Sequence, residues 1–408
     1  MKKIYQPVKK KTILIVDDDQ VVAHIYREKF ERQGFKVEVA GDGDRALQML
    51  KKHPADLVIL DLCLPGMNGV EVLKNIRLEF EMQAVPVIVF SNAYLGNLMR
   101  AALDAGATRS VTKSDGTPAK MVELVRELLA LDHSKAADAG QPDTKLQPDP
   151  VATLQLSAPE ALAKLRAAHG AFARTEQEEL QRTELSEMHR QVRSLAGSAG
   201  LLGFRKIAQM ANALEALFFE LHAKPKNITP SVMRTIAQAI DTLAFLFGHA
   251  TDSQPEVLVA PRILIVDDEI ISRKTICSAL GKASLTAVSL DDSLAAQRLL
   301  EQDHFDLIFL DVEMPGQSGL ELCVSIRKMA TNRTTPVVFV TAHSDFGSRA
   351  QSALSGGNDF IAKPFLSVEL AVKALSWLFK ESPRSLSAIT AQGIEGTTRR
   401  PISSTVAA

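Results

Sequence analysis

The strongest constraint on the fold is an internal repeat whose two copies lie 250 residues apart, the separation of Asp17 from Asp267. Four pairs of motifs keep this offset: TILIVDDDQ with RILIVDDEI, DLVILDLCLPGMNGVEVL with DLIFLDVEMPGQSGLELC, PVIVFSNA with PVVFVTAH, and SVTK with FIAK. No insertion separates the matched motifs. The chain therefore contains two copies of one domain, and a different segment lies between them.

Each copy has the pattern of an α/β domain. Short, continuously apolar runs such as ILIV and LVIL are typical of strands that are buried on both faces. They alternate about five times with amphipathic stretches such as 21–33 and 69–80. This alternation predicts a doubly wound domain, in which a parallel sheet lies between two layers of helices.

Polar residues that match between the copies follow the predicted strands. In the first copy they are Asp17, Asp18, Asp61, Ser91 and Lys113, and in the second they are Asp267, Asp268, Asp311, Thr341 and Lys363. Binding sites of doubly wound domains lie beyond the carboxyl ends of the strands. Carboxylates that converge there repel each other unless a cation lies among them, and oxygen ligands beside a phosphate favour Mg²⁺. The alternative is that these acids only cap strand ends.

With this spacing, both copies resemble receiver domains of two-component signalling, over residues 8–131 and 259–380. The resemblance implies a (βα)5 flavodoxin-like fold and phosphoryl acceptance on Asp61 and Asp311. It implies an Mg²⁺ cofactor with these ligands: Asp17, Asp18, Asp61 and the Cys63 carbonyl in the first copy, and Asp267, Asp268, Asp311 and the Glu313 carbonyl in the second. It also implies that Lys113 and Lys363 neutralise phosphoryl oxygens, and that Ser91 and Thr341 hydrogen-bond the acyl phosphate.

The two copies differ around the lysine. The second copy has Phe360 where the receiver family has its switch ring, and Pro364 follows Lys363, the usual setting of a cis peptide bond. The first copy has Ser110 and Ser114 at these two positions. We therefore expect the second copy to be the ordinary phosphorylation switch. We expect the first to accept phosphate but to signal differently or weakly.

The middle segment has helical periodicity. Residues 132–156 are rich in Pro, Ala, Asp and Gly and are predicted to form a linker, as are residues 250–258. Between them, at 157–249, apolar residues recur at steps of three and four, which predicts an all-α four-helix bundle. The tail at 381–408 is rich in Ser and Thr, lacks apolar periodicity and is predicted to be disordered.

The run VRSLAGSAGLLGF at 192–204 resembles the signature helix of histidine phosphotransfer (HPt) domains, with one difference. Arg193 occupies the position of that family's phosphorylatable histidine. A guanidinium stays protonated and cannot accept a phosphoryl group as an imidazole nitrogen can. Two interpretations are open: Arg193 is an inert, exposed helix residue, or it places its cation in a receiver's acidic pocket. In the second case the bundle docks a receiver, of this chain or another, without exchanging phosphate. Gly197, one turn later, would allow the close approach.

His189 precedes Arg193 by one helical turn and is the candidate for a displaced phosphoacceptor. A shift of one turn moves the reacting nitrogen by about 5–6 Å. Transfer that depends on in-line geometry does not tolerate such a shift. We therefore interpret His189 as a solvated or capping residue.

Other function classes lack their signatures. The net charge is −1, and the chain has no helix-turn-helix, no Gly-rich phosphate loop and no apolar run of transmembrane length. We therefore expect a cytoplasmic protein that is not an enzyme, with no nucleic-acid partner and no membrane insertion. The sequence predicts a phosphorylation-controlled signalling protein that acts through protein contacts. A sensor histidine kinase or phosphotransfer protein lies upstream and a protein partner downstream. The alternative is a phosphorelay carrier that uses His189.

Overall fold

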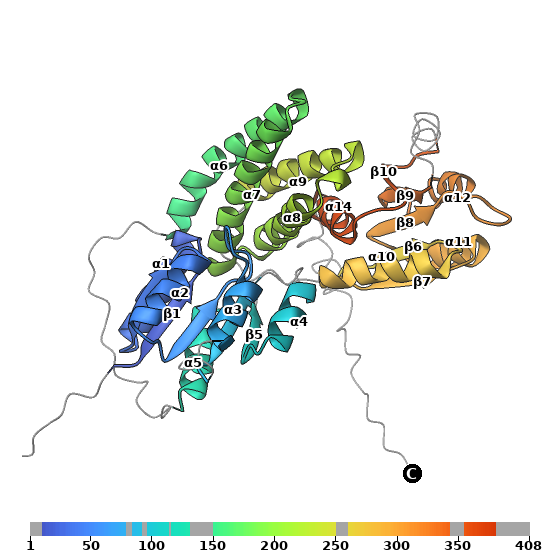
Figure 1. Ribbon diagram of the computed structural model, residues 1–408. Helices are drawn as coiled ribbons and strands as arrows, with labels where there is room; N and C mark the ends of the chain where they lie inside the picture. The colour runs from blue at the N-terminus through green and yellow to red at the C-terminus, as the bar shows by residue number, and fades with distance from the viewer. Residues whose placement is uncertain are drawn as a thin grey trace, which may run out of the picture.

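The computed structural model describes both repeat copies and the middle segment. It covers residues 10–78, 84–91, 96–113, 116–130, 150–249, 260–342 and 355–380. The predicted linker at 250–258 and the tail at 381–408 lie outside the described residues, as does most of the linker at 132–156. Along the chain, a first sheet domain is followed by a helical bundle and a second sheet domain, coloured from blue to red in Figure 1.

The described part of the first copy alternates strands and helices. The strands are β1 (Thr12–Val16), β2 (Lys36–Ala40), β3 (Leu57–Leu60), β4 (Val87–Ser91) and β5 (Arg109–Thr112). The helices are α1 (Gln20–Arg32), α2 (Gly43–Lys52), α3 (Gly69–Leu78), α4 (Gly96–Asp104) and α5 (Pro118–Leu128). All strand pairs are parallel, in the order β2-β1-β3-β4-β5.

The second copy has the same topology. Its strands are β6 (Ile263–Val266), β7 (Ala287–Leu290), β8 (Leu307–Asp311), β9 (Val337–Thr341) and β10 (Asp359–Ala362). Its described helices are α10 (Ile270–Lys282), α11 (Ser293–Gln302), α12 (Gly319–Ile326) and α14 (Ser367–Lys380). The parallel order β10-β9-β8-β6-β7 repeats the first sheet, read from its other edge. The predicted doubly wound fold is confirmed in both copies.

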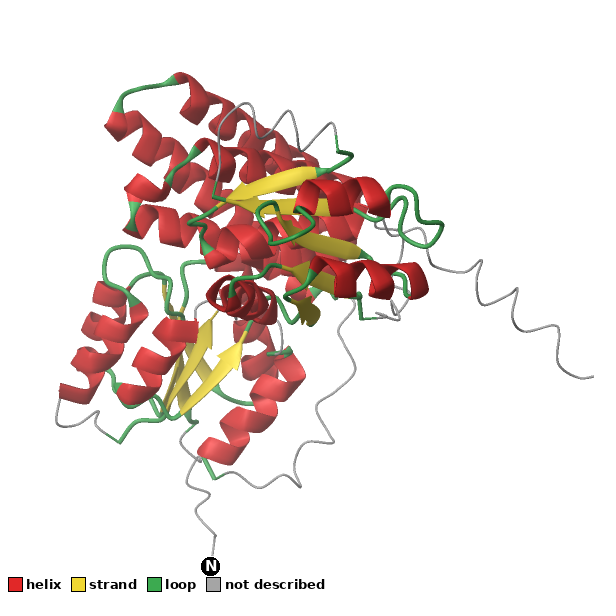
Figure 2. Ribbon diagram, turned by 90° about the vertical axis from the view of Figure 1, so that its right-hand side faces the viewer, coloured by secondary structure: helices red, strands yellow, loops and turns green. Residues whose placement is uncertain are grey.

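Burial explains the strand sequences. The central strands β3, β4, β6 and β8 are buried along their whole length, which accounts for their unbroken apolar runs. The edge strands β2 and β7 are partly exposed and accept polar residues, as in KVEVA and AVSL. Helices cover both faces of each sheet (Figure 2).

One glycine in each copy holds a helix against the carboxyl end of a central strand. A Cβ at Gly69 would lie 2.2 Å from the carbonyl oxygen of Asp61, and a Cβ at Gly319 would lie 1.8 Å from that of Asp311. No side chain fits at either distance. The start of α3 and of α12 can therefore approach the aspartate only with glycine.

The middle segment is a bundle of four α-helices, as predicted: α6 (Pro150–Arg174), α7 (Glu178–Leu201), α8 (Arg205–Ala223) and α9 (Pro230–Gly248). A 3-10 turn (Pro225–Asn227) precedes α9. Helix α6 begins at Pro150, inside the segment that composition assigned to the linker. Proline lacks a backbone N–H. It is tolerated there because N–H groups in the first turn of a helix have no hydrogen-bond partner within the helix. Among the described helices, none combines the length and the hydropathy that crossing a bilayer requires.

The bundle lies between the two copies and is joined to the second by a shared core. Helix α14 of the second copy packs on α8 and α9 (Figure 1). One apolar cluster runs from Leu214 and Leu243 of the bundle to Leu375 of α14. The first copy has two apolar clusters of its own, one on each face of its sheet. The bundle and the second copy therefore form one packing unit.

Buried polar contacts fix the geometry of this shared core. Asp359, which begins β10, accepts hydrogen bonds from Lys373 of α14 and from Gln238 of α9, each at 2.9 Å. The Lys373 side chain is only 1% exposed. Glu369 of α14 accepts a hydrogen bond of 2.7 Å from Ser231 of α9. These bonds orient α14 on the bundle, because a buried charge must keep its partner.

We expect Lys373→Ala to destabilise the unit formed by the bundle and the second copy by about 3–5 kcal/mol, because it leaves the Asp359 carboxylate without its cation. Urea unfolding followed through the fluorescence of Trp377, the only tryptophan, measures the effect. Lys380→Ala at the exposed end of α14 is the control, and its change should stay within about 0.5 kcal/mol. Equal changes in the free energy of unfolding for the two substitutions would contradict a stabilising role of the Lys373–Asp359 pair.

Candidate functional site

The carboxyl edge of the second sheet gathers the predicted acids. Oxygens of Asp267, Asp268 and Asp311 all lie within 4.8 Å of one another. Asp267 and Asp311 are buried, whereas Asp268 is exposed. Lys363 Nζ donates hydrogen bonds to Asp267 (2.9 Å) and to Asp311 (3.0 Å), and the Lys363–Pro364 bond is cis, as predicted.

The charges of this cluster are partly compensated. Burial raises the pKa of Asp311, and the negative Asp267 adds to the rise, while the hydrogen bond from Lys363 opposes it. Burial lowers the pKa of Lys363, but its hydrogen bonds to the two aspartates outweigh burial and raise it. The cluster thus holds an ammonium group close to Asp311, and its oxygens, with Asp268 on the exposed side, could hold a further cation.

The first copy brings together the matching residues. Oxygens of Asp17, Asp18 and Asp61 also lie within 4.8 Å of one another. Lys113 Nζ donates hydrogen bonds to Asp17 (3.0 Å) and Asp61 (2.7 Å). The two clusters therefore consist of the same residue types, three aspartates and one lysine, at matched positions of the same fold.

The first cluster differs from the second because a side chain of the bundle enters it. The guanidinium of Arg193, on α7, donates hydrogen bonds to the Asp61 carboxylate and to the Cys63 carbonyl, and it forms an ion pair with Asp18. Its Nη2 lies 3.5 Å from Asp17 Oδ1. Arg193 is only 9% exposed, so the interpretation as an inert, exposed helix residue is wrong.

Gly197, one turn after Arg193, lets α7 approach α1 this closely. A Cβ at position 197 would lie 2.6 Å from Val22 Cγ2 and 2.7 Å from Asp19 Oδ2. Both neighbours are buried and have little freedom to move. The close approach that the sequence suggested for Gly197 is present, and its partner is the first copy.

Arg193 changes the electrostatics of Asp61. Burial raises the pKa of Asp61, but the nearby Lys113 and Arg193 outweigh burial and lower it to about 2. Burial likewise disfavours the charged form of Arg193, yet Asp61 and Asp17 raise its pKa well above the ordinary value. Asp61 is therefore a firmly ionised, paired carboxylate, whereas the pKa of Asp311 is shifted upward.

Glu215 is a residue of the site that was not predicted from the sequence. This residue of α8 is 3% exposed, and its Oε1 lies 3.9 Å from Nε of Arg193. It faces the guanidinium from the side of the bundle. The available signal was a glutamate inside the apolar run ALEALFF, where a buried charge needs a partner.

The predicted switch residues lie around the clusters. Ser91 and Thr341 are buried at the ends of β4 and β9. The Phe360 ring on β10 lies 4.9 Å from the guanidinium carbon of Arg234, a residue of α9. Glu313 follows β8, and its side chain is exposed. The contact between Arg234 of the bundle and the Phe360 ring was not predicted from the sequence.

His189 is not a solvated or capping residue, contrary to the interpretation from sequence. Its ring packs 5.5 Å from that of His222 and 6.3 Å from that of Phe218. Burial, with the nearby Arg193 and His222, lowers its pKa to about 3. Nε2 is buried and makes no hydrogen bond to any described residue. His189 is a neutral packing residue of the bundle.

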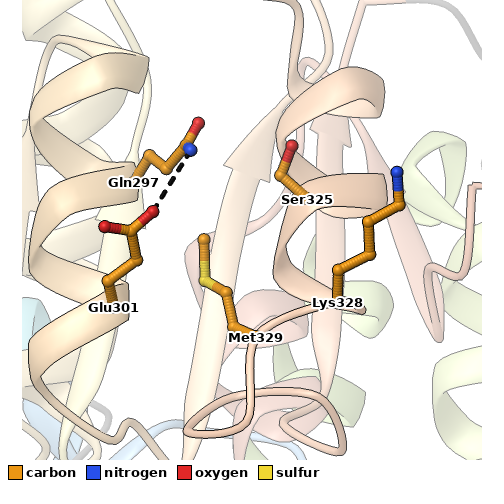
Figure 3. Close-up of a pocket in the computed structure, with 5 residues that line it drawn as sticks. All are labelled: Gln297, Glu301, Ser325, Lys328 and Met329. Atoms are coloured by element: carbon orange, nitrogen blue, oxygen red, sulfur yellow. Dashed lines mark hydrogen bonds between the residues drawn. The ribbon is translucent and has the colours of Figure 1, made fainter.

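A cleft of about 390 Å³ between α11 and α12 is separate from the acidic clusters. Figure 3 shows its walls, which consist of Gln297, Glu301, Ser325, Lys328 and Met329. None of these residues belongs to an acidic cluster.

Comparison with known families agrees with this geometry. The family model of the response regulator receiver domain matches residues 13–126 and 263–375, more than half of the chain. The Hpt domain model matches residues 151–244. The chain therefore belongs to the response regulator receiver family, with two receiver domains flanking an Hpt domain. The first copy is receiver 1 and the second copy is receiver 2.

Similar proteins match only parts of this chain. The phosphate regulon transcriptional regulatory protein PhoB of Klebsiella pneumoniae is 33% identical over 128 residues, which are 31% of this chain and 56% of PhoB. Sensor protein GacS of Pseudomonas syringae pv. syringae is 29% identical over 168 residues, 40% of this chain and 18% of GacS. The chain thus spans about half the length of PhoB and a smaller share of GacS.

Solved structures of single receivers match one domain at a time. A putative response regulator from Chloroflexus aurantiacus is 31% identical and covers 30% of this chain and 99% of its own, with a TM-score of 0.29. The receiver domain of sensor histidine kinase PA1611 from Pseudomonas aeruginosa, with a magnesium ion in its active site cleft, is 27% identical. It covers 30% of this chain and 99% of its own, with a TM-score of 0.28.

We expect Gly197→Ala to loosen the contact between α7 and α1, because its Cβ would overlap Val22 and Asp19. Hydrogen exchange of the amides in α1 measures the effect, and we expect faster exchange. Gly200→Ala on the same helix is the control, since its Cβ would lie 3.8 Å from the nearest atom, Ala208 Cβ, an ordinary contact. Unchanged exchange in Gly197→Ala would show that the approach of α7 is not needed.

Proposed function

We propose that Asp311 of receiver 2 accepts a phosphoryl group and that receiver 2 reports this event through the bundle. The chain is a phosphorelay signalling protein by its domains, and the acceptor residue is the part that we propose. The observation that carries the proposal is the cluster of Asp267, Asp268 and Asp311 around Lys363, which is open at Asp268. We also propose that the protein contacts a protein partner downstream, that it is located in the cytoplasm and that it does not turn over a substrate.

The acids of receiver 2 fit Mg²⁺. Three carboxylates within 4.8 Å supply hard oxygen ligands, and one of them faces solvent, which suits a cation that keeps several waters. Asp267, Asp268, Asp311 and the Glu313 carbonyl are the proposed ligands. When bound, Mg²⁺ would offset the negative charge of the incoming phosphoryl oxygens.

The chain's own groups account for the transfer. An oxygen of Asp311 attacks phosphorus of a phosphohistidine on a kinase or phosphotransfer protein. The O–P bond forms, the P–N bond breaks, and the imidazole leaves with the electron pair. Lys363, held by Asp267 and Asp311, is placed to bind the phosphoryl oxygens. The hydroxyl of Thr341, at the end of β9, is the proposed hydrogen-bond donor to the acyl phosphate.

The contact between receiver 2 and the bundle supports the proposal that receiver 2 signals through the bundle. The switch ring of Phe360 lies against Arg234 of α9, and Glu369 of α14 binds Ser231 on the same helix. A move of Phe360 that follows phosphorylation therefore changes a contact with the bundle, whose far side meets receiver 1.

The alternative function, a phosphorelay carrier that uses His189, is not favoured. A phosphoacceptor nitrogen must reach a donor in line. His189 packs among bundle rings, and its Nε2 is buried. The position that faces the acidic cluster of receiver 1 belongs to Arg193, which cannot carry phosphate.

We expect intact mass spectrometry, after incubation with a small phosphodonor and micromolar Mg²⁺, to show an adduct in the wild type that is lost in Asp311→Ala. The adduct should persist in Asp61→Ala and in His189→Gln. If Asp311→Ala retains the full adduct, Asp311 is not the acceptor. If His189→Gln loses it, the carrier alternative returns.

We expect Arg234→Ala to speed phosphorylation of Asp311 about two- to fivefold. A cation–π contact contributes about 0.5–1 kcal/mol, and here it stabilises the unphosphorylated position of the Phe360 ring. The rate of adduct formation in the wild type and the variant measures the effect. Arg190→Ala is the control, because Arg190 is an exposed bundle residue paired with Glu187. A rate equal to that of the wild type would rule out this coupling.

A further inference from the structure

The acidic cluster of receiver 1 already holds a cation. The guanidinium of Arg193 contacts the carboxylates of Asp61 and Asp18 and the carbonyl of Cys63, and it lies near Asp17. These are the oxygens that the receiver resemblance assigns to Mg²⁺. The donor set of receiver 1 therefore fits a metal by its chemistry, but Arg193 occupies it.

We propose that Arg193 replaces Mg²⁺ in receiver 1 and that the docked bundle closes the Asp61 site to metal and to phosphoryl donors. The inference goes beyond the proposed function, which concerns Asp311 of receiver 2, because it addresses the acidic cluster of receiver 1. It assigns to the bundle a role as an internal competitor of divalent cations. Receiver 1 becomes reactive only when α7 withdraws Arg193.

Comparison of the two receivers supports the replacement. Asp267 and Asp311 of receiver 2 pair with Lys363. The acids of receiver 1 pair with two side-chain cations, Lys113 and Arg193. A divalent ion brought to the same oxygens would meet a buried positive charge within a few ångströms, where water screens poorly. Metal and guanidinium cannot share the ligands, so binding of one excludes the other.

The bundle is built to hold the guanidinium in this position. Glu215 faces Nε from α8, and Gly197 allows α7 to sit against α1. Cys63, whose carbonyl accepts a hydrogen bond from Arg193, is buried together with the apolar core of the bundle. Arg193 therefore arrives with its charge balanced on both sides.

A count of metal sites in the full chain tests the proposal. Mn²⁺ replaces Mg²⁺ as the probe, and electron paramagnetic resonance of the free ion gives the bound fraction. Asp311→Ala removes the site of receiver 2, so that any remaining binding reports on receiver 1. At low micromolar Mn²⁺, well below the millimolar range in which a divalent ion competes with Arg193, we expect no bound Mn²⁺ in Asp311→Ala, one site in Asp311→Ala/Arg193→Ala, and none again when Asp18→Asn is added. The gain in affinity should exceed about tenfold.

Controls separate this inference from a folding defect. Arg190→Ala, in the Asp311→Ala background, removes an exposed arginine of the same helix and should create no site. Arg193→Lys in that background keeps a charge but loses the planar fork of donors, so its Mn²⁺ affinity should fall between those of the parent chain and of Arg193→Ala. Equal Mn²⁺ binding before and after the Arg193→Ala substitution would overturn the proposal, and so would no binding in either chain.

Hydrogen exchange gives a second readout that does not depend on Asp311. Millimolar Mg²⁺ should speed amide exchange in α1 of the wild type, because metal displaces α7. In Arg193→Ala, exchange should be fast and independent of Mg²⁺. Exchange in the wild type that is insensitive to Mg²⁺ would contradict competition. Loss of the Asp311 adduct would leave this test unaffected, so the two proposals fail separately.

Discussion

The need to neutralise converging carboxylates at the end of a parallel sheet governs this protein. The fold brings three acids within 4.8 Å of one another in each receiver. Lys113 and Lys363 each supply one positive charge, which is not enough for three carboxylates. In receiver 2 the remaining negative charge is not compensated on the exposed side, where a metal ion fits. In receiver 1, Arg193 from the bundle supplies a second positive charge to the three carboxylates. One electrostatic requirement thus has two solutions in one chain.

The two receivers are attached to the bundle by different kinds of interface. Receiver 2 shares an apolar core with the bundle, and its α14 is buried along most of its length. Receiver 1 keeps two apolar clusters of its own and contributes Cys63 to the bundle's cluster, and it meets the bundle mainly at Arg193 and at the contact of α7 with α1. An ionic contact responds to a competing cation, whereas a shared core does not. The interface that can open is therefore the one between the bundle and receiver 1.

The Hpt domain retains its fold and contacts a receiver of the same chain, although Arg193 stands in place of the histidine. Arg193 stands where the phosphoacceptor is expected, and it still points into a receiver's acidic pocket. The bundle can therefore contact a receiver without transferring a phosphoryl group. Helix packing depends on the apolar stripes and on Gly197, whereas phosphoryl transfer depends on one imidazole. Within our proposals, receiver 2 takes the input, the bundle transmits it, and receiver 1 is the site that the bundle opens or closes.

The sequence alone determined the repeat, the doubly wound fold, the bundle and the membership of both acidic clusters. These follow from local rules, since apolar periodicity sets the elements and parallel strands bring their carboxyl ends to one edge. It also singled out Arg193 and Gly197. Only the tertiary structure decided that Arg193 enters receiver 1, that Glu215 faces it, that Arg234 covers Phe360 and that His189 is packed inside the bundle. These contacts join surfaces more than a hundred residues apart, or residues of different helices, and no periodicity encodes which surfaces meet.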